Sequence, residues 1–252
     1  MNIMQEALTV PDIEKCKRLL CIQPHPDDNE VGAGAVIAKL AENGCEVYYL
    51  TVTDGSLGTS DVSVSINQLI DIRKKEQQAA AALLGVKGMY SLGLRDKTTL
   101  NVSEISSKLV GIIREVKPDM IMTVDPWAPY EGHPDHYKTG FAAVDAFLSA
   151  GNPRFPYVDD DTIHPTWDVV GIAFYFTAYP NTFVDVSKYF DKKMEAIKKH
   201  QSQFTPEVIK MYEMYFKAKG MQLAEGRGFE IAEGLKVMSG LHLHCFPDAI
   251  HL

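Results

Sequence analysis

The sequence lacks several features that would assign it to a specialised class of protein. Its 252 residues contain no uncharged apolar run near the roughly 20 residues that cross a bilayer, and the N-terminus has no signal-peptide core. The four cysteines, Cys16, Cys21, Cys45 and Cys245, show no CxxC spacing. We therefore expect a cytoplasmic protein that does not act at a membrane, with reduced, structural thiols and with Cys21 and Cys45 in or beside core strands.

Positive charge is also scarce. The chain has 25 Lys and Arg residues against 33 Asp and Glu residues, which gives a net charge of −8, and no basic stripe is visible. Binding to a phosphate backbone needs the opposite balance, so we expect no nucleic-acid partner. The composition is otherwise that of a globular protein, and the length fits a single domain over residues 1–252.

Apolar strand patterns alternate with helical patterns in the first 150 residues. This alternation predicts right-handed strand–helix–strand units and hence an α/β fold with a Rossmann-like, mainly parallel sheet and helices on both faces. The expected strands cover residues 19–24, 46–53, 89–92 and 119–124, and the expected helices cover 32–43, 68–84, 103–116 and 133–149.

The second half of the chain is less regular. Prolines and an acidic run over residues 151–167 predict an excursion over the surface, acting as a lid or as a subunit contact. Residues 1–17 are expected to form a helix or an arm. Further strands are expected over residues 167–176 and 182–186, and helices over 188–203, 206–224 and 229–238.

Two segments rich in His and Asp each follow an expected central strand. They are His25-Pro26-Asp27-Asp28 and His133-Pro134-Asp135-His136. Open α/β sheets place their ligand sites at this end of the strands. A hydrolytic zinc site needs three protein ligands and one open position, and each segment offers two such side chains three residues apart. The remaining residues can supply a base and a partner for an oxyanion.

Simpler explanations exist for each residue alone. A single His at a strand end is more often a hydrogen-bonded loop residue than a ligand, and an Asp pair before a helix often serves as its cap. Capping does not explain two His-Pro-Asp segments placed after two central strands. We therefore favour one shared metal site.

The paired segments resemble the motifs of the LmbE/PIG-L family of zinc-dependent N-deacetylases, and in particular its diacetylchitobiose and bacillithiol-pathway members. The resemblance extends from residue 19 to about residue 140. Many members have Glu directly after the Asp pair, where this chain has Asn29 and then Glu30. Further similar stretches are Glu30-Val31-Gly32-Ala33-Gly34, Thr53-Asp54-Gly55, Arg73-Lys74-Lys75-Glu76 and, more weakly, His200-Gln201-Ser202-Gln203.

The resemblance implies a role for each residue of the two motifs. His25, Asp28 and His136 would bind one Zn²⁺ per chain, although these ligand types also suit iron and other divalent ions. Asp27 would be the general base that deprotonates the metal-bound water. His133 would stabilise the oxyanion as a cation.

Smaller roles are expected for residues around the motifs. Arg73 would bind sugar hydroxyls at the rim of the site, and Asp54 would hold its loop near the metal with a contact to the substrate. Asp135 would orient one of the imidazoles. Three aromatic residues are candidates for stacking on a sugar, although buried packing explains each of them as well: Trp127, Tyr175 and Tyr179. For His242 and His244 two placements are expected as alternatives: on a strand edge, or facing the site of a neighbouring subunit.

The family resemblance implies hydrolysis of the N-acetyl group of GlcNAc, diacetylchitobiose or a GlcNAc conjugate, by a trimer or hexamer. The first alternative is an amidase of the same family that acts on a thiol-sugar conjugate or an antibiotic intermediate. A metal-dependent phosphoesterase is a second alternative, but it would usually need two ions and a basic cradle. A sugar-binding protein without catalytic activity is the third, and it would have no use for Asp27 as a base.

Overall fold

The computed structural model describes residues 9–244 and 246–252. Cys245 and the first eight residues of the expected N-terminal helix or arm lie outside the described residues. From residue 9 to residue 17 the expected helix is reduced to one 3-10 turn, η1 (Ile13–Lys15). Among the described residues, no helix is both long and apolar enough to span a membrane.

One sheet of seven strands runs through the described part of the chain, in the order β3-β2-β1-β4-β5-β7-β6. The five strands from β3 to β5 are parallel to their neighbours, whereas β7 is antiparallel to both β5 and β6. This arrangement confirms the predicted Rossmann-like, mainly parallel sheet. The strands are β1 (Arg18–Gln23), β2 (Glu46–Thr53), β3 (Gly88–Leu94), β4 (Met120–Val124), β5 (Gly171–Tyr175), β6 (Thr182–Asp185) and β7 (Ala232–Met238).

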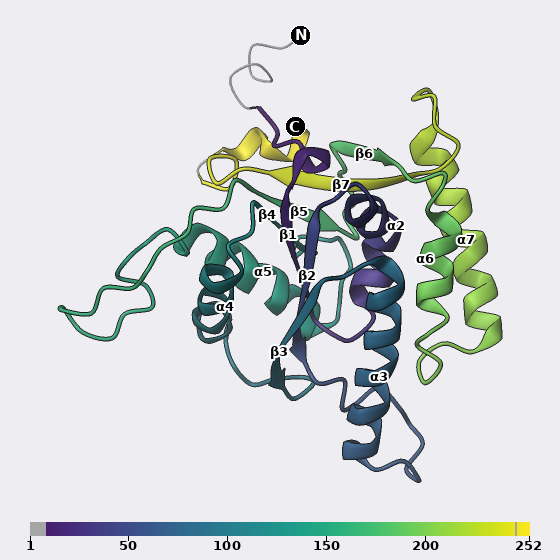
Figure 1. Ribbon diagram of the computed structural model, residues 1–252, viewed down its shortest axis with the longest axis horizontal. Coiled ribbons are helices and arrows are strands. Elements are labelled where there is room, and N and C mark those ends of the chain that lie inside the picture. The colour runs from purple at the N-terminus through teal and green to yellow at the C-terminus, as the bar shows by residue number, and fades with distance from the viewer. Residues whose placement is uncertain (1–8, 245) are drawn as a thin grey trace.

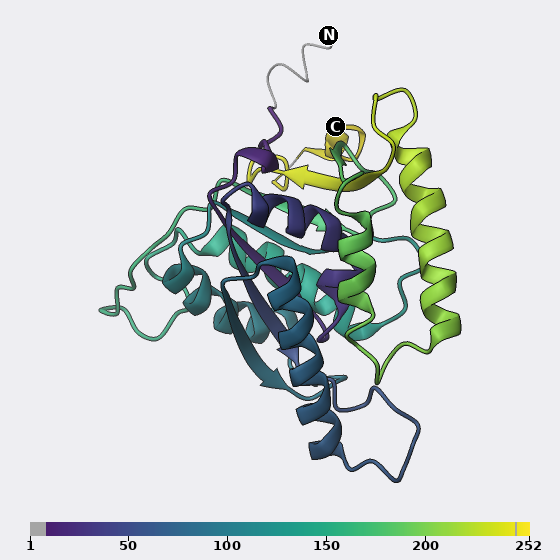
Figure 2. The ribbon, with the colours of Figure 1, turned by 45° about the vertical axis from the view of Figure 1, so that its right-hand side comes forward.

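Helices cover both faces of the sheet (Figures 1 and 2). Helices α4 (Val102–Val116) and α5 (Pro134–Ser149) pack together on one face. On the other face, α2 (Asp28–Glu42) lies against the sheet, and α3 (Ile66–Leu84) and α6 (Phe190–Ile197) pack beside it. The outermost helix is α7 (Pro206–Ala224).

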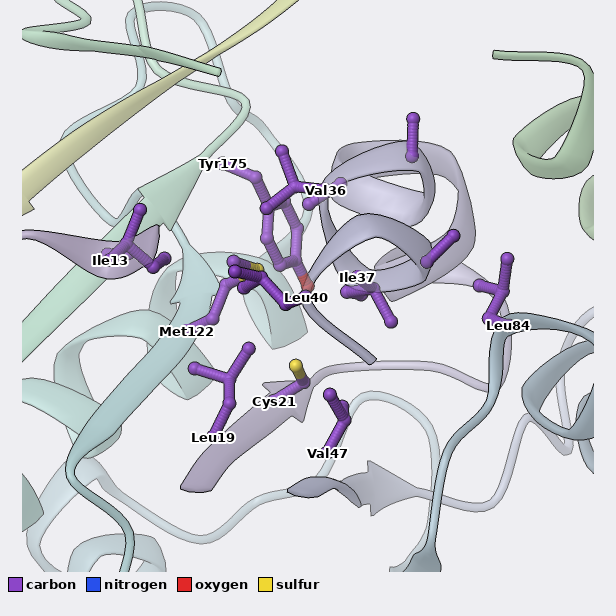
Figure 3. Close-up of a cluster of buried hydrophobic side chains, with 14 of the residues drawn as sticks. Ile13, Leu19, Cys21, Val36, Ile37, Leu40, Val47, Leu84, Met122 and Tyr175 are labelled. Carbon is purple, nitrogen blue, oxygen red and sulfur yellow. The ribbon is translucent and has the colours of Figure 1, made fainter. Parts of the chain in front are cut away.

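The central strands carry buried apolar residues on both faces, as central parallel strands require. The residues of one face form the core between the sheet and α2. Figure 3 shows Leu19 and Cys21 of β1 beneath Val36 and Ile37 of α2, with the ring of Tyr175 beside them. Cys21 is fully buried and Cys45 is buried directly before β2, as expected. Cys16, Cys21 and Cys45 are free thiols.

The helix expected over residues 229–238 is wrong, because residues Ala232–Met238 form strand β7. The segment contains Ala, Glu, Leu and Lys, which favour helices in isolation. In the fold it lies between β5 and β6 and pairs its backbone with both. Tertiary hydrogen bonding of this kind overrides a weak local preference.

Two helices differ from their expected limits, whereas α5 begins at Pro134, directly after His133, where a helix was expected to start. Helix α2 begins at Asp28 rather than at residue 32. Both motifs therefore enter the first turn of a helix. Helix α6 ends at Ile197, which leaves residues 198–203 as turns. The expected excursion over residues 151–167 projects from the body of the protein (Figure 1).

Gly32 of α2 lies directly against the side chain of Tyr175 in β5. A Cβ at this position would lie 2.2 Å from Cδ2 of Tyr175, whose side chain is fully buried and cannot swing away. We expect Gly32→Ala to reduce the free energy of unfolding by about 1–3 kcal/mol, measured by urea denaturation. Gly111→Ala in α4 is the matched control, because a Cβ there has nothing within 4 Å. Equal midpoints for the two variants would contradict this packing.

Candidate active site

The two motifs meet at the carboxyl ends of β1 and β4. These strands are neighbours, and the chain order reverses between them, since β2 and β3 extend the sheet on one side and β5 on the other. Such switch points open a crevice where ligands bind. The imidazole centroid of His25 lies 4.7 Å from that of His133 and 5.3 Å from that of His136.

Hydrogen bonds from neighbouring elements fix the turn that carries the first motif. The backbone N–H and the hydroxyl of Thr53 both donate to the carbonyl of Pro24, at 2.9 and 2.8 Å. The backbone N–H of Asn29 donates to Oε1 of Gln23 at 2.8 Å. The turn is therefore held by β2 and by the end of β1 before any ligand arrives.

The carboxylate of Asp28 lies between two imidazoles. Its Oδ2 is 3.2 Å from Nδ1 of His25, and its Oδ1 is 3.4 Å from Nε2 of His136. Ligand atoms about 2.0–2.2 Å from one tetrahedral ion are about 3.3 Å apart, so each separation has the length expected between two ligands of one ion, although the two contacts use different oxygens of Asp28. The structure places the three side chains expected as ligands next to one another.

The second nitrogen of each imidazole is held by another carboxylate. Nε2 of His25 lies 3.3 Å from Oδ2 of Asp135, and Nδ1 of His136 lies 2.9 Å from Oε2 of Glu131. Metal-binding histidines usually donate their other N–H to such a partner, which fixes the ring and directs the remaining lone pair at the ion. Asp135 contacts an imidazole as expected. Glu131 was missed by the sequence analysis, although it lies two residues before His133.

The charges around Asp28 favour a cation at this point. Burial opposes the protonated form of His25, but hydrogen bonds to Asp135 and Asp28 outweigh it and raise the pKa of His25 to about 10. Burial would raise the pKa of Asp28, but His136 and His25 lower it to about 2. Both shifts favour positive charge between His25 and Asp28, and a divalent ion bound there would compete with a proton for the same ligand atoms.

Two groups of side chains have ligand atoms within 4.8 Å of one another among the described residues. One comprises His25, His133 and His136, and the other comprises His25, Asp96 and Asp135. In the second group the two oxygens of Asp96 already accept the backbone N–H groups of Gly55 and Leu57, both at 2.8 Å. Oδ2 of Asp28 likewise accepts the backbone N–H of His25 at 2.8 Å, so Oδ1 is its oxygen without a backbone donor. His25 belongs to both groups and contacts Asp28, so a metal site at the motifs would be centred on His25.

Asp27 forms an ion pair with Arg73. Its Oδ2 lies 3.2 Å from Nη2 of Arg73, whose Nη1 donates to the carbonyl of Gly55 at 3.2 Å. Burial raises the pKa of Asp27, and the guanidinium opposes that shift. Arg73 is only 3% exposed, yet it lines the cavity above the motifs, so its role as a sugar contact stays a prediction. Its contacts hold Asp27 in one orientation.

The surroundings of His133 disfavour its protonated form. Burial lowers the pKa of His133 below the usual 6.5, and the nearby imidazoles of His25 and His136 lower it further. The backbone N–H of Asp135 donates to Nδ1 of His133 at 3.3 Å, so in the neutral ring the proton lies on Nε2. Nε2–H can therefore donate a hydrogen bond whether or not the ring carries a second proton.

Other candidates lie outside the motif cluster. Asp54 accepts the backbone N–H of Ser56 at 3.0 Å and so holds its own loop. Tyr175 is packed in the core, whereas Trp127 and Tyr179 line a separate hollow of about 580 Å³. His242 is buried beside that hollow and accepts the backbone N–H of Ser239.

A cavity of about 650 Å³ opens above the motif cluster. Charged residues of the motifs and loops line one side, and aromatic residues line the other. No described residue of 151–167 lines it, which gives no support to a lid. The aromatic side comprises Phe176 after β5, Phe204, and Tyr212, Tyr215 and Phe216 of α7.

The fold and the two motifs define an α/β protein of the de-N-acetylase class. The model of the PIG-L family, described as GlcNAc-PI de-N-acetylase, matches residues 20–147, and the chain belongs to this family. It is 38% identical over 233 residues to diacetylchitobiose deacetylase of Thermococcus kodakarensis, and the aligned region covers 92% of this chain and 87% of the relative. A probable N-acetyl-α-D-glucosaminyl L-malate deacetylase 2 of Bacillus cereus is 31% identical over 74% of this chain and 84% of its own length.

Solved structures show the same fold. N,N'-diacetylchitobiose deacetylase from Pyrococcus horikoshii, complexed with its inhibitor MPG, superimposes with a TM-score of 0.86 and 39% identity, over 93% of this chain and 88% of that chain. The 4-carboxy-2-hydroxymuconate hydratase GalB from Pseudomonas putida gives a TM-score of 0.70 at 23% identity, over 87% and 95% of the two chains. This second likeness concerns the fold alone.

Proposed function

We propose that this chain is a metal-dependent deacetylase that hydrolyses the N-acetyl group of an N-acetylglucosamine-type sugar. The observation that carries the proposal is the carboxylate of Asp28 between His25 and His136, with Asp27 beside it and uncommitted to either imidazole. Membership in the PIG-L family and the named activities of its relatives support the same substrate class.

His25, Asp28 and His136 would hold the ion, and we propose Zn²⁺, one per chain. Bound there, the ion would acidify water and polarise the acetyl carbonyl. The protein supplies the remaining chemistry. The carboxylates of Asp135 and Glu131 contact the second ring nitrogen of His25 and of His136, respectively. These contacts keep each imidazole in the tautomer whose other nitrogen can bind a cation.

Proton transfer falls to Asp27. Its carboxylate accepts a proton from the water that attacks the acetyl carbon and passes it to the sugar nitrogen as the C–N bond breaks. Arg73 holds the carboxylate in place through this exchange. Nε2–H of His133 donates to the acetyl oxygen while negative charge develops on it. The products are acetate and a free amine.

An acetate-release assay tests this function. We expect the protein to release acetate and amine in equal amounts from at least one of GlcNAc, diacetylchitobiose and a GlcNAc–malate conjugate. A chelator should abolish release, and added Zn²⁺ should restore it. Release that persists in the metal-free protein would contradict the proposal.

The same assay distinguishes the alternatives. Turnover of a thiol-sugar conjugate or an antibiotic intermediate, without turnover of the three sugars, would indicate a different amide substrate within the family. Phosphate release from a phosphomonoester would indicate a phosphoesterase. We also propose, from the sequence, a cytoplasmic homo-oligomer, a trimer or hexamer, and size-exclusion chromatography with light scattering checks its mass.

A further inference from the structure

Helix α7 packs against the body of the protein with one side only. Of its 19 residues, Gly220 and Ala224 are the two that are buried. The side that faces solvent carries apolar side chains at a spacing of three, four and three residues, which places them on one face of the helix. This methionine face comprises Met211, Met214, Ala218 and Met221, and the three methionines are 54%, 66% and 56% exposed. The spacing is that of a helix that packs against a partner.

Positive charge borders the methionine face. Lys210 and Lys217 are exposed on α7, directly before Met211 and Ala218, and neither forms an ion pair with a described residue. Exposed methionines adapt to the shape of a partner and are frequent in protein-binding surfaces. The face therefore suits a partner segment that is both apolar and acidic.

The projecting loop over residues 151–167 has this composition. An exposed acidic run lies between exposed apolar side chains, and its carboxylates form no ion pair within the part of the chain that the structure describes. The apolar residues are Tyr157, Val158 and Ile163, exposed by 71%, 62% and 61%, and the acidic residues are Asp159, Asp160 and Asp161. Large apolar side chains gathered on a segment that projects into solvent mark an interaction site.

Hydrogen bonds within the projecting loop fix its shape. Oδ1 of Asp159 accepts the backbone N–H and the hydroxyl of Thr162, both at 2.7 Å. Nη1 of Arg154 donates to the carbonyl of Asp160 at 2.6 Å. A segment that is ordered before it binds loses less conformational entropy on binding. The loop is therefore suited to docking as a preformed unit.

The projecting loop and α7 lie on opposite sides of the molecule. Figures 1 and 2 both show the sheet between them, so the loop does not reach α7 of its own chain. A contact between the two surfaces therefore joins two copies. Because each copy carries both surfaces, the contact is head-to-tail, and its repetition produces a ring when the rotation closes.

We propose that the projecting loop of one copy docks on the methionine face of α7 of the next copy, with its aspartates beside Lys210 and Lys217. This inference rests on the proposed homo-oligomer and identifies the two surfaces that join its subunits. The opposite side of α7 carries Tyr212, Tyr215 and Phe216, which line the catalytic cavity. A neighbouring copy thus holds in place the helix that shapes one wall of the site.

Charge reversal tests the contact in the full-length protein. We expect Lys210→Glu with Lys217→Glu to raise the dissociation constant of the oligomer by at least about tenfold, because like charges would then face each other. Asp160→Lys with Asp161→Lys should have the same effect. A chain with all four substitutions should associate as the wild-type chain does. Size-exclusion chromatography with light scattering, over a range of protein concentrations, measures the masses.

A matched control makes the same change in charge elsewhere. Lys74 and Lys75 are exposed lysines of α3, and Lys74→Glu with Lys75→Glu should keep the wild-type mass. Unchanged masses in both charge-reversed chains overturn the interface and leave the oligomer. A chain with all four substitutions that stays dissociated overturns the pairing of these charges. A monomeric wild-type protein overturns both the interface and the oligomer, whereas acetate release is measured separately.

A cysteine cross-link identifies which surfaces meet. Co-expressed copies with Ile163→Cys and with Met214→Cys should form a covalent dimer with a short bismaleimide. Neither copy by itself should exceed the wild-type background. A covalent dimer from Met214→Cys alone would show that two α7 helices pair with each other, and it would overturn the head-to-tail contact.

Discussion

Asp27→Asn is expected to lower kcat/KM for acetate release by about a thousandfold, within the range for loss of a general base. The amide keeps the size of the carboxylate and an oxygen for Arg73, which lies 3.2 Å away, so the geometry should persist. It cannot accept the proton of the attacking water. Metal content, measured by inductively coupled plasma mass spectrometry, should equal that of the wild-type protein.

A matched control for this variant is Asp71→Asn. Asp71 is an exposed carboxylate on α3, two residues from Arg73 and outside the cavity. We expect wild-type activity from it. If Asp27→Asn retained turnover with its metal in place, Asp27 would not be the base, and the proton would have to leave by another side chain.

Asp28→Ala should give the complementary result, in which both the metal and the activity are lost. The carboxylate of Asp28 is the group that His25 and His136 share, so its removal leaves two imidazoles without the anion between them. We expect activity to fall by about a thousandfold or more, since the ion contributes several kcal/mol to transition-state stabilisation.

Thermal unfolding provides the measurement that does not depend on turnover. An ion that binds only the folded state raises Tm as its concentration rises. The wild-type protein and Asp27→Asn should show this increase when Zn²⁺ is added to the metal-free form, and Asp28→Ala should not. If Asp28→Ala gained the same increase in Tm, the ion would be held by another group, such as His25, His133 and His136.

The sequence by itself determined the elements that local patterns specify. Apolar runs such as Met120–Val124 are buried on both faces and require a central strand, and Asn101 and Ser65 cap the helices that follow them. The carboxyl ends of parallel strands meet at one edge of a sheet, so both His-Pro-Asp motifs could be placed at that edge, whereas the pairing of β1 with β4 is seen only in the structure. Four of the site residues could therefore be grouped from spacing alone: His25, Asp28, His133 and His136.

Tertiary structure alone decided which groups surround that cluster. Glu131 orients His136 across a loop, and Arg73 reaches Asp27 from α3 only because α3 packs beside α2. The lowered pKa of His133 follows from burial beside two imidazoles, which no local pattern records.

The second half of the chain shows most clearly that local sequence patterns do not specify contacts between distant elements. Residues 232–238 have helix-forming side chains, yet they form β7 because two strands from elsewhere in the chain offer backbone partners. His200, fully buried after α6, lies 3.5 Å from the carboxylate of Glu30, a residue that the sequence marks only as part of a helix start. The aromatic side of the cavity comes mainly from α7, about 180 residues after the first motif. Spacing along the chain specifies the catalytic groups, whereas the contacts between distant elements specify the shape and charge of the space around them.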